Sequence, residues 1–292
     1  MRSLPLAASL LLAGCAASPA PVATAPPLPP MATSLEAAKP PAALQYLYGS
    51  AEAAIAVRAT NRRIADYGVW RIKQRPRDSV VLAAGATMTA PTFEPCGNKP
   101  FAAVFDADET LVWNLGSMRW FAQQGIAFDA KIWDQWEKTG AGKAVAMPGT
   151  VEMVRKLRAA GIAVIANTNR SAANAKGSED TLRAAGLGDF KHGETLFLMG
   201  DDAGGSSKDG RRATIAAKYC VIILAGDQLG DFSQQFNGKD IPAATRTALA
   251  TGPAAAALWD QGWFLFPNSV YGPWEKLGWD ETFPSDKNWE PK

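Results

Sequence analysis

The sequence predicts an α/β protein: a Rossmann-like, mostly parallel sheet with helices on both faces, plus a smaller helical, aromatic-rich cap or insertion. Short apolar runs at 101–105, 162–166 and 220–225 have the length and composition of buried strands. Segments with helical periodicity separate them, and this alternation is typical of a parallel sheet. Each run ends in polar residues, and ligands bind just past the carboxyl ends of such strands.

The elements can be placed in order along the chain. The stretch 111–138 holds four tryptophans without clean periodicity and is interpreted as the insertion. Pro148 suits a first helical turn, and Gly161 suits the end of that helix. Helices are predicted at 42–67, 148–160, 178–185 and 208–218. A fourth strand is predicted at 195–199, and one more short element of unspecified type at 80–88.

Size and charge limit the possible functions. The chain has 292 residues, 47% of them hydrophobic, which is enough for one large domain or two small ones. The net charge of +2 and the absence of a basic stripe give no footprint for a nucleic acid polymer. The oligomeric state does not follow from the sequence.

The N-terminus predicts export. Residues 1–14 have a positive start, a short apolar core and small residues before a cleavage point, as in a signal peptide. Leu12-Ala13-Gly14-Cys15 resembles a bacterial lipobox, in which Cys15 is lipidated; an ordinary signal with a chance cysteine is the alternative. Ala16 after the cysteine suggests, by the same resemblance, the outer membrane, on its periplasmic or surface face.

A tether follows the predicted lipidation site. Residues 15–41 are rich in proline and alanine, and proline keeps such a segment extended. The predicted domain organisation is therefore a signal peptide (1–14), a lipidated tether (15–41) and one folded domain (42–292). Within that domain Cys96 and Cys220 could form a disulfide, if their segments adjoin, or remain two buried thiols.

The strand at 101–105 ends in Asp106-Ala107-Asp108, the most informative feature of the chain. Unpaired carboxylates are too costly to bury, so both aspartates should lie outside the core. Two anions this close repel each other unless a cation or a shared proton relieves them. A hard metal ion such as Mg²⁺, which prefers oxygen ligands, would do so.

Polar residues recur at the other strand ends and helix starts, in the order Asp106/Asp108, Thr168, Lys208, Asp227/Asp231. Each signal alone is weak, because a threonine after a strand is commonly a helix cap and most lysines are solvated. A DxD pair also occurs in sugar-transfer enzymes. The combination resembles the four motifs of the haloacid dehalogenase superfamily of phosphatases.

The match is closer to one branch of that superfamily. Phe128 to Trp133, Val164 to Arg170, Gly226 to Phe232 and Pro267 to Glu275 look like the class C acid phosphatases, bacterial lipoproteins that include the lipoprotein-e type of 5′-nucleotidase. The resemblance runs from about residue 44 to the C-terminus. It implies hydrolysis of phosphomonoesters, often nucleoside monophosphates, with Mg²⁺.

The resemblance also implies roles for individual residues. Asp106 would attack phosphorus and form an aspartyl-phosphate, and Asp108 would act as general acid and base. Asp106, Asp227, Asp231 and the backbone carbonyl of Asp108 would form the metal site. The remaining predicted site residues contact substrate: Thr168, Asn169, Arg170, Lys208 and Arg211 at the phosphoryl group, and Trp133, Tyr271 and Phe128 at the nucleobase.

Other functions remain open at this stage. A broad acid phosphatase without nucleotide preference fits the same motifs, and a non-catalytic lipoprotein module on this scaffold would fit if the site were degenerate. A histidine acid phosphatase needs a nucleophilic histidine with paired arginines, and the single histidine, His192, lacks that setting. A glycosyltransferase does not account for Thr168 and Lys208.

Overall fold

The computed structural model describes residues 39–238 and 241–291. These residues belong to one compact unit, which begins at Lys39, three residues before the predicted start of the folded domain. The predicted signal peptide, Cys15 and most of the tether lie outside the described residues. No helix among the described residues is both long and apolar enough to span a membrane.

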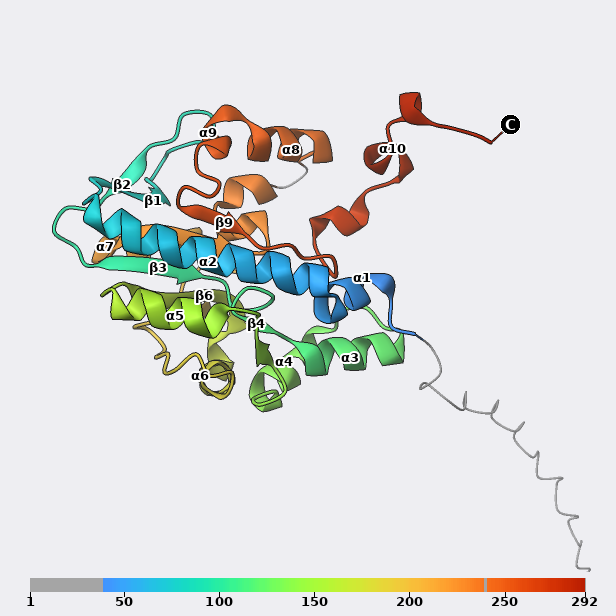
Figure 1. The fold of residues 1–292 in the computed structure, drawn as a ribbon, viewed down its shortest axis with the longest axis horizontal. Helices are drawn as coiled ribbons and strands as arrows, with labels where there is room; N and C mark the ends of the chain where they lie inside the picture. The colour runs from blue at the N-terminus through green and yellow to red at the C-terminus, as the bar shows by residue number, and fades with distance from the viewer. Residues whose placement is uncertain (1–38, 239–240, 292) are drawn as a thin grey trace, which may run out of the picture. The chain divides into compact units, whose positions relative to one another are not determined.

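The centre of the described part is a five-stranded sheet with the order β7-β6-β3-β8-β9, in which every neighbouring pair is parallel (Figure 1). This confirms the predicted α/β class. Two small antiparallel pairs, β1 with β2 and β4 with β5, lie outside this sheet. The strand bounds are β1 Asp78–Leu82, β2 Phe93–Pro95, β3 Phe101–Phe105, β4 Val112–Trp113, β5 Val145–Ala146, β6 Ala163–Ser171, β7 Leu196–Met199, β8 Cys220–Gly226 and β9 Trp263–Leu265.

Helices cover both faces of the sheet, as predicted. On β3, Ala103 and Phe105 face a core shared with α2 and α5, whereas Ala102 and Val104 face a second core that includes α7. Figure 1 shows α2 and α5 lying across the near face of the sheet, with α7 behind it. The helix bounds are α1 Ala42–Leu44, α2 Ala51–Lys73, α3 Leu115–Gln124, α4 Ala130–Thr139, α5 Thr150–Ala159, α6 Ala175–Ala184, α7 Asp209–Lys218, α8 Ala243–Thr251, α9 Pro253–Ala256 and α10 Trp279–Thr282.

Most predicted elements are present, with shifted ends. β3 has the predicted bounds, whereas β6 runs on to Ser171, so Thr168 lies inside a strand and not after one. The prediction that Pro148 opens a helix was wrong by two residues: α5 begins at Thr150, after Gly149 at the N-cap. The predicted insertion at 111–138 forms β4, α3 and nearly all of α4, and β4 pairs with β5, which lies beyond the predicted bounds.

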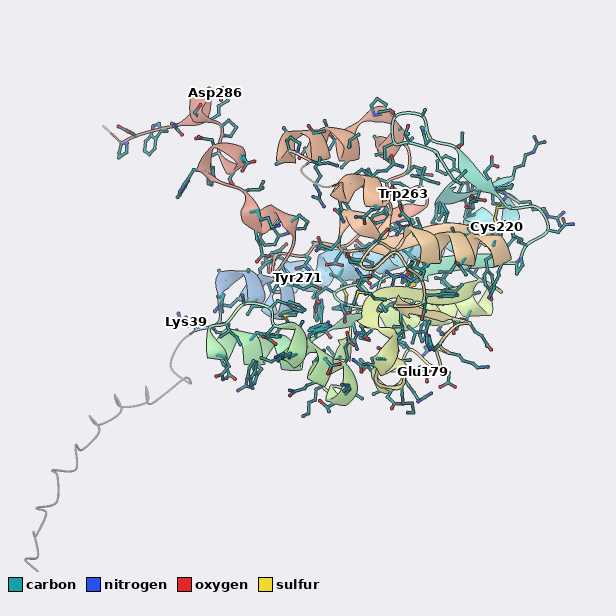
Figure 2. All side chains as sticks on the ribbon, turned by 180° about the vertical axis from the view of Figure 1, so that it is seen from behind. Lys39, Glu179, Cys220, Trp263, Tyr271 and Asp286 are labelled. Atoms are coloured by element: carbon teal, nitrogen blue, oxygen red, sulfur yellow. A yellow bond between two sulfur atoms is a disulfide. The ribbon has the colours of Figure 1, made fainter. Side chains whose placement is uncertain are left out.

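A disulfide joins Cys96 and Cys220, which resolves the alternative that the sequence left open. Cys220 is the first residue of β8 and pairs with Phe101 at the start of β3. The bridge therefore lies at the amino ends of the two central strands. In Figure 2 Cys220 lies at the end of the sheet away from Tyr271.

Candidate active site

A cavity of about 1000 Å³ opens at the carboxyl ends of β3, β6 and β8. Its wall contains all six side chains on which the predicted chemistry depends, although these are spread over the chain from 106 to 231. They are Asp106, Asp108, Thr168, Lys208, Asp227 and Asp231. Polar residues thus gather at one sheet edge because the strands are parallel and the connections return outside the sheet.

Asp106 and Lys208 form a buried ion pair at the floor of the cavity. The backbone N–H of Asp106 donates to the Ala225 carbonyl of β8 (2.9 Å), which fixes the residue just past β3. Lys208 Nζ lies 2.5 Å from Asp106 Oδ1 and 2.6 Å from Asp231 Oδ1, and Lys208 is only 5% exposed. Burial alone would lower the pKa of Lys208, but the attraction of Asp106 and Asp231 raises it above its usual value.

Among the described residues, Asp106, Asp227 and Asp231 form a buried group whose carboxylate oxygens lie within 4.8 Å of one another. Burial, together with the other carboxylates, raises the pKa of Asp106 to about 7, despite the opposing effect of Lys208. Burial, together with the charges of Asp231 and Asp106, raises the pKa of Asp227 well above its usual value. One lysine does not balance three carboxylates, so this donor set fits a divalent cation with oxygen ligands.

Two amides and a glycine hold this group in place. Asp227 Oδ2 accepts hydrogen bonds from Gln228 Nε2 (2.9 Å) and from Asn268 Nδ2 (2.7 Å). Asp231 Oδ2 accepts from the backbone N–H of Gln228 (2.9 Å). A Cβ at Gly226 would come within 2.1 Å of the Asp231 carboxylate, so only glycine lets Asp231 approach the end of β8.

The Asp108 side chain accepts hydrogen bonds from Arg170 and Asn114. Arg170 Nη2 lies 2.6 Å from Asp108 Oδ1, and the Arg170 side chain is only 2% exposed. The Asp108 carboxylate is not part of the three-carboxylate group, so a contribution of Asp108 to the metal site is left to its backbone carbonyl.

Thr168 and Asn169 line the cavity, but Arg170 and Arg211 do not. Arg211 donates to the Thr168 carbonyl and, at 2.6 Å, to Asn169 Oδ1. The two arginines were predicted to contact the substrate phosphoryl group, but neither lines the cavity. Each donates hydrogen bonds to protein acceptors instead, although Arg211 Nε has no partner among the described residues. Through these hydrogen bonds Arg170 holds Asp108, and Arg211 holds Thr168 and Asn169.

Tyr271 lines the cavity and its hydroxyl is tied to a buried carboxylate. It donates to Glu109 Oε2 (2.5 Å), while Tyr48 donates to Glu109 Oε1 (3.0 Å). Glu109 has no exposed surface, and burial raises its pKa. The C-terminal segment leaves the rest of the described part just after Tyr271 (Figure 2).

An apolar part of the cavity wall comes from the predicted insertion. Phe128 is 68% exposed and its ring centroid lies 5.9 Å from that of Trp133 and 6.5 Å from that of Phe121. All three residues, with Met118 and Ile126, line the cavity. The aromatic residues predicted to bind a base therefore share the cavity with the charged group, Tyr271 on one segment and Phe128 and Trp133 on another.

Sequence reasoning missed the residues that hold the predicted ones. Asn114, Gln228 and Asn268 carry no chemical signature of their own, although Gln228 and Asn268 each fall inside one of the quoted motifs. Glu109 follows Asp108 directly and could have been noticed as a third carboxylate. His192 lies outside the cavity wall, with Nε2 2.7 Å from Asp201 Oδ1.

The cavity thus brings together a buried lysine, three grouped carboxylates that fit a divalent cation, and Asp108, which is the arrangement that the phosphatase motifs predicted. The chain belongs to the haloacid dehalogenase superfamily, subfamily IIIB, the acid phosphatases, whose family model matches residues 40–274. It is therefore a phosphatase, as the motifs predicted.

Solved structures agree with this fold. The chain is similar to the class C acid phosphatase from Bacillus anthracis with tungstate bound, with a TM-score of 0.60 and 22% sequence identity over 80% of this chain and 85% of that one. A second structure of that enzyme gives the same values. At this identity the likeness concerns the fold.

Proposed function

We propose that this acid phosphatase is Mg²⁺-dependent and hydrolyses nucleoside monophosphates and related phosphomonoesters through an aspartyl-phosphate on Asp106. The observation that carries the proposal is the position of Asp106, paired with Lys208 and grouped with Asp227 and Asp231 in the cavity wall. Such a group favours a dianionic phosphoryl group only when a cation offsets the carboxylates.

The protein residues then divide the reaction between them. A carboxylate oxygen of Asp106 attacks phosphorus, and Asp108 gives a proton to the departing ester oxygen and later takes one from water. Thr168 and Lys208 hydrogen-bond the phosphoryl oxygens as charge moves onto them. Mg²⁺, held by Asp106, Asp227, Asp231 and the Asp108 carbonyl, would neutralise charge on the phosphoryl group.

The full-length protein in detergent tests this proposal. We expect release of phosphate from p-nitrophenyl phosphate, AMP and nicotinamide mononucleotide, its loss in EDTA and its return with Mg²⁺. Tungstate, bound by the Bacillus anthracis enzyme, has the tetrahedral shape of phosphate and should inhibit. Asp106→Asn should abolish turnover in a folded protein; a protein that binds these esters without turning them over would be the non-catalytic module.

Nucleotide preference is testable at the aromatic wall. Removing Trp133 or Tyr271 should raise KM for AMP, since stacking is worth roughly 1–3 kcal/mol per base, and should spare small aryl phosphates. Tyr271→Phe separates the ring from its hydrogen bond to Glu109 and should keep KM for AMP near the wild-type value. Equal losses on AMP and p-nitrophenyl phosphate would instead support a broad phosphatase, which the exposed apolar Phe128 also suits.

We also propose export and anchoring through Cys15, with the enzyme at the bacterial outer membrane. The lipobox resemblance supports this, and salvage of nucleosides from impermeable nucleotides gives it a purpose. Labelled palmitate should appear in the wild-type protein in cells and not in Cys15→Ser, and the variant should lose its membrane association. Equal labelling of both proteins would exclude lipidation at Cys15.

A further inference from the structure

The two oxygens of the Asp108 carboxyl group have very different surroundings. Oδ1 lies close to three donors: Arg170 Nη2 (2.6 Å), Arg170 Nε (3.0 Å) and Asn114 Nδ2 (2.9 Å). Oδ2 lies near one of these donors only, Arg170 Nε, at 3.2 Å. A carboxylate oxygen has two lone pairs, so Oδ1 has no acceptor capacity left for a proton, whereas Oδ2 does.

The donors themselves are fixed. Asn114 Oδ1 accepts from Arg170 Nη2 (2.9 Å) and from the indole Nε1–H of Trp136 (2.9 Å), which orients the amide with Nδ2 towards Asp108. Arg170 is 2% exposed, and its guanidinium carbon lies 6.0 Å from the centroid of the Trp133 ring. A lysine could not replace this arrangement, because the planar fork makes two parallel contacts with one carboxylate.

We propose that Arg170, together with Asn114, is a positioning residue that orients Asp108 so that Oδ2 is the oxygen that carries and transfers the proton. This inference rests on the proposed role of Asp108 as general acid and base. Arg170 does not line the cavity, so its effect on the reaction would pass through Asp108. The sequence assigned it to substrate binding because it follows Thr168 closely in the chain.

The step that depends on this orientation is departure of the leaving group. A bond forms between an Asp106 oxygen and phosphorus while the bond from phosphorus to the ester oxygen breaks. The proton on Asp108 Oδ2 passes to that ester oxygen, which leaves as an alcohol, and Asp108 becomes a carboxylate. Asp108 regains a proton at Oδ2 from the water whose oxygen attacks phosphorus. The bond between phosphorus and the Asp106 oxygen then breaks, which restores the Asp106 carboxylate and releases phosphate.

Leaving groups distinguish this role from a structural one. p-Nitrophenolate departs without a proton, whereas an alkoxide requires one, so only alkyl esters depend strongly on an oriented acid. We expect Arg170→Met to lower kcat/KM for an alkyl phosphate such as glycerol phosphate by about 100-fold, within the usual range for general acid catalysis. The loss for p-nitrophenyl phosphate should stay within about 3-fold.

The matched control is Arg211→Met. Arg211 is equally buried, but it donates hydrogen bonds to Thr168 and Asn169 and not to Asp108. The fall in kcat/KM of Arg211→Met should therefore be the same for both esters. Arg170→Lys keeps the positive charge without the planar fork, so the difference between the two esters in the fall of kcat/KM should be present but smaller. This variant also tests the inference if Arg170→Met folds poorly. In an Asp108→Asn background, Arg170→Met should cause no further split.

Each result decides a separate question. Equal losses on the alkyl and aryl esters for both Arg170 variants would overturn the inference, and so would a further split caused by Arg170→Met in the Asp108→Asn background. If the wild-type enzyme hydrolyses neither ester with Mg²⁺, the proposed function fails. Hydrolysis without a split leaves the proposed function intact and removes only the role of Arg170.

Discussion

Burial and charge have opposing effects at Asp106. Its ion pair with Lys208 stabilises the carboxylate, but burial beside Asp231 and Asp108 outweighs this and raises its pKa to about 7. In the protein without a metal ion the site is therefore a local source of instability. Strained or repelling groups of this kind are common where an active site must hold a ligand.

Asp106→Asn should make the metal-free protein more stable. The folded-state pKa of about 7 exceeds the reference value of 3.8, so the folded state binds more protons between these values. Stability attributable to Asp106 therefore falls as pH rises from about 4 to 7, and the variant removes this fall. Thermal melting in EDTA should show a larger gain in Tm at pH 8 than at pH 5; a gain independent of pH would contradict the shift.

The insertion and the end of β6 are joined by close packing of α4 against α6. Glu137 of α4 accepts hydrogen bonds from the backbone N–H of Ser171 (3.0 Å) and from Asn174 Nδ2 (2.8 Å), and burial raises its pKa. A Cβ at Gly177 would lie 2.0 Å from the Glu137 carbonyl oxygen. Glycine is required here by the close approach of two helices, not by its own backbone angles.

Gly177→Ala should separate α4 from α6 and disturb the apolar wall that α4 supplies. We expect a loss of about 1–3 kcal/mol in the free energy of unfolding, as for other overpacked sites, and a higher KM for AMP. Urea unfolding and steady-state kinetics measure the two effects. Gly49→Ala is the control, because no atom lies within 4 Å of a Cβ at that position; similar losses in both variants would refute the packing argument.

At the scale of the whole described part, a disulfide cross-links one end of the sheet, and the active-site residues lie at the other end. The disulfide between Cys96 and Cys220 spans a sequence separation of 124 residues and lies at the amino ends of β3 and β8. The charged side chains lie at the opposite, carboxyl ends. Stability and catalysis are thus assigned to different ends of the same strands.

Reducing this disulfide should lower stability without changing turnover at low temperature. A disulfide typically contributes about 2–4 kcal/mol to the free energy of unfolding. For a domain of this size the expected fall in Tm is about 5–15 °C. Cys96→Ala/Cys220→Ala should reproduce the fall seen with a reductant while retaining kcat for p-nitrophenyl phosphate at 15 °C; an unchanged Tm would show that the bridge adds nothing.

The three-residue strand β9 was not predicted, but the sequence predicted the other four strands of the parallel sheet and the six charged or polar residues of the cavity. This was possible because apolar period and strand-end position are local signals, and parallel strands bring their carboxyl ends to one edge. Tertiary structure alone decided that Arg170 and Arg211 turn behind the cavity wall, that Thr168 lies within β6, and that Cys96 meets Cys220. It also supplied Asn114, Gln228 and Asn268, whose hydrogen bonds depend on segments brought together only by folding.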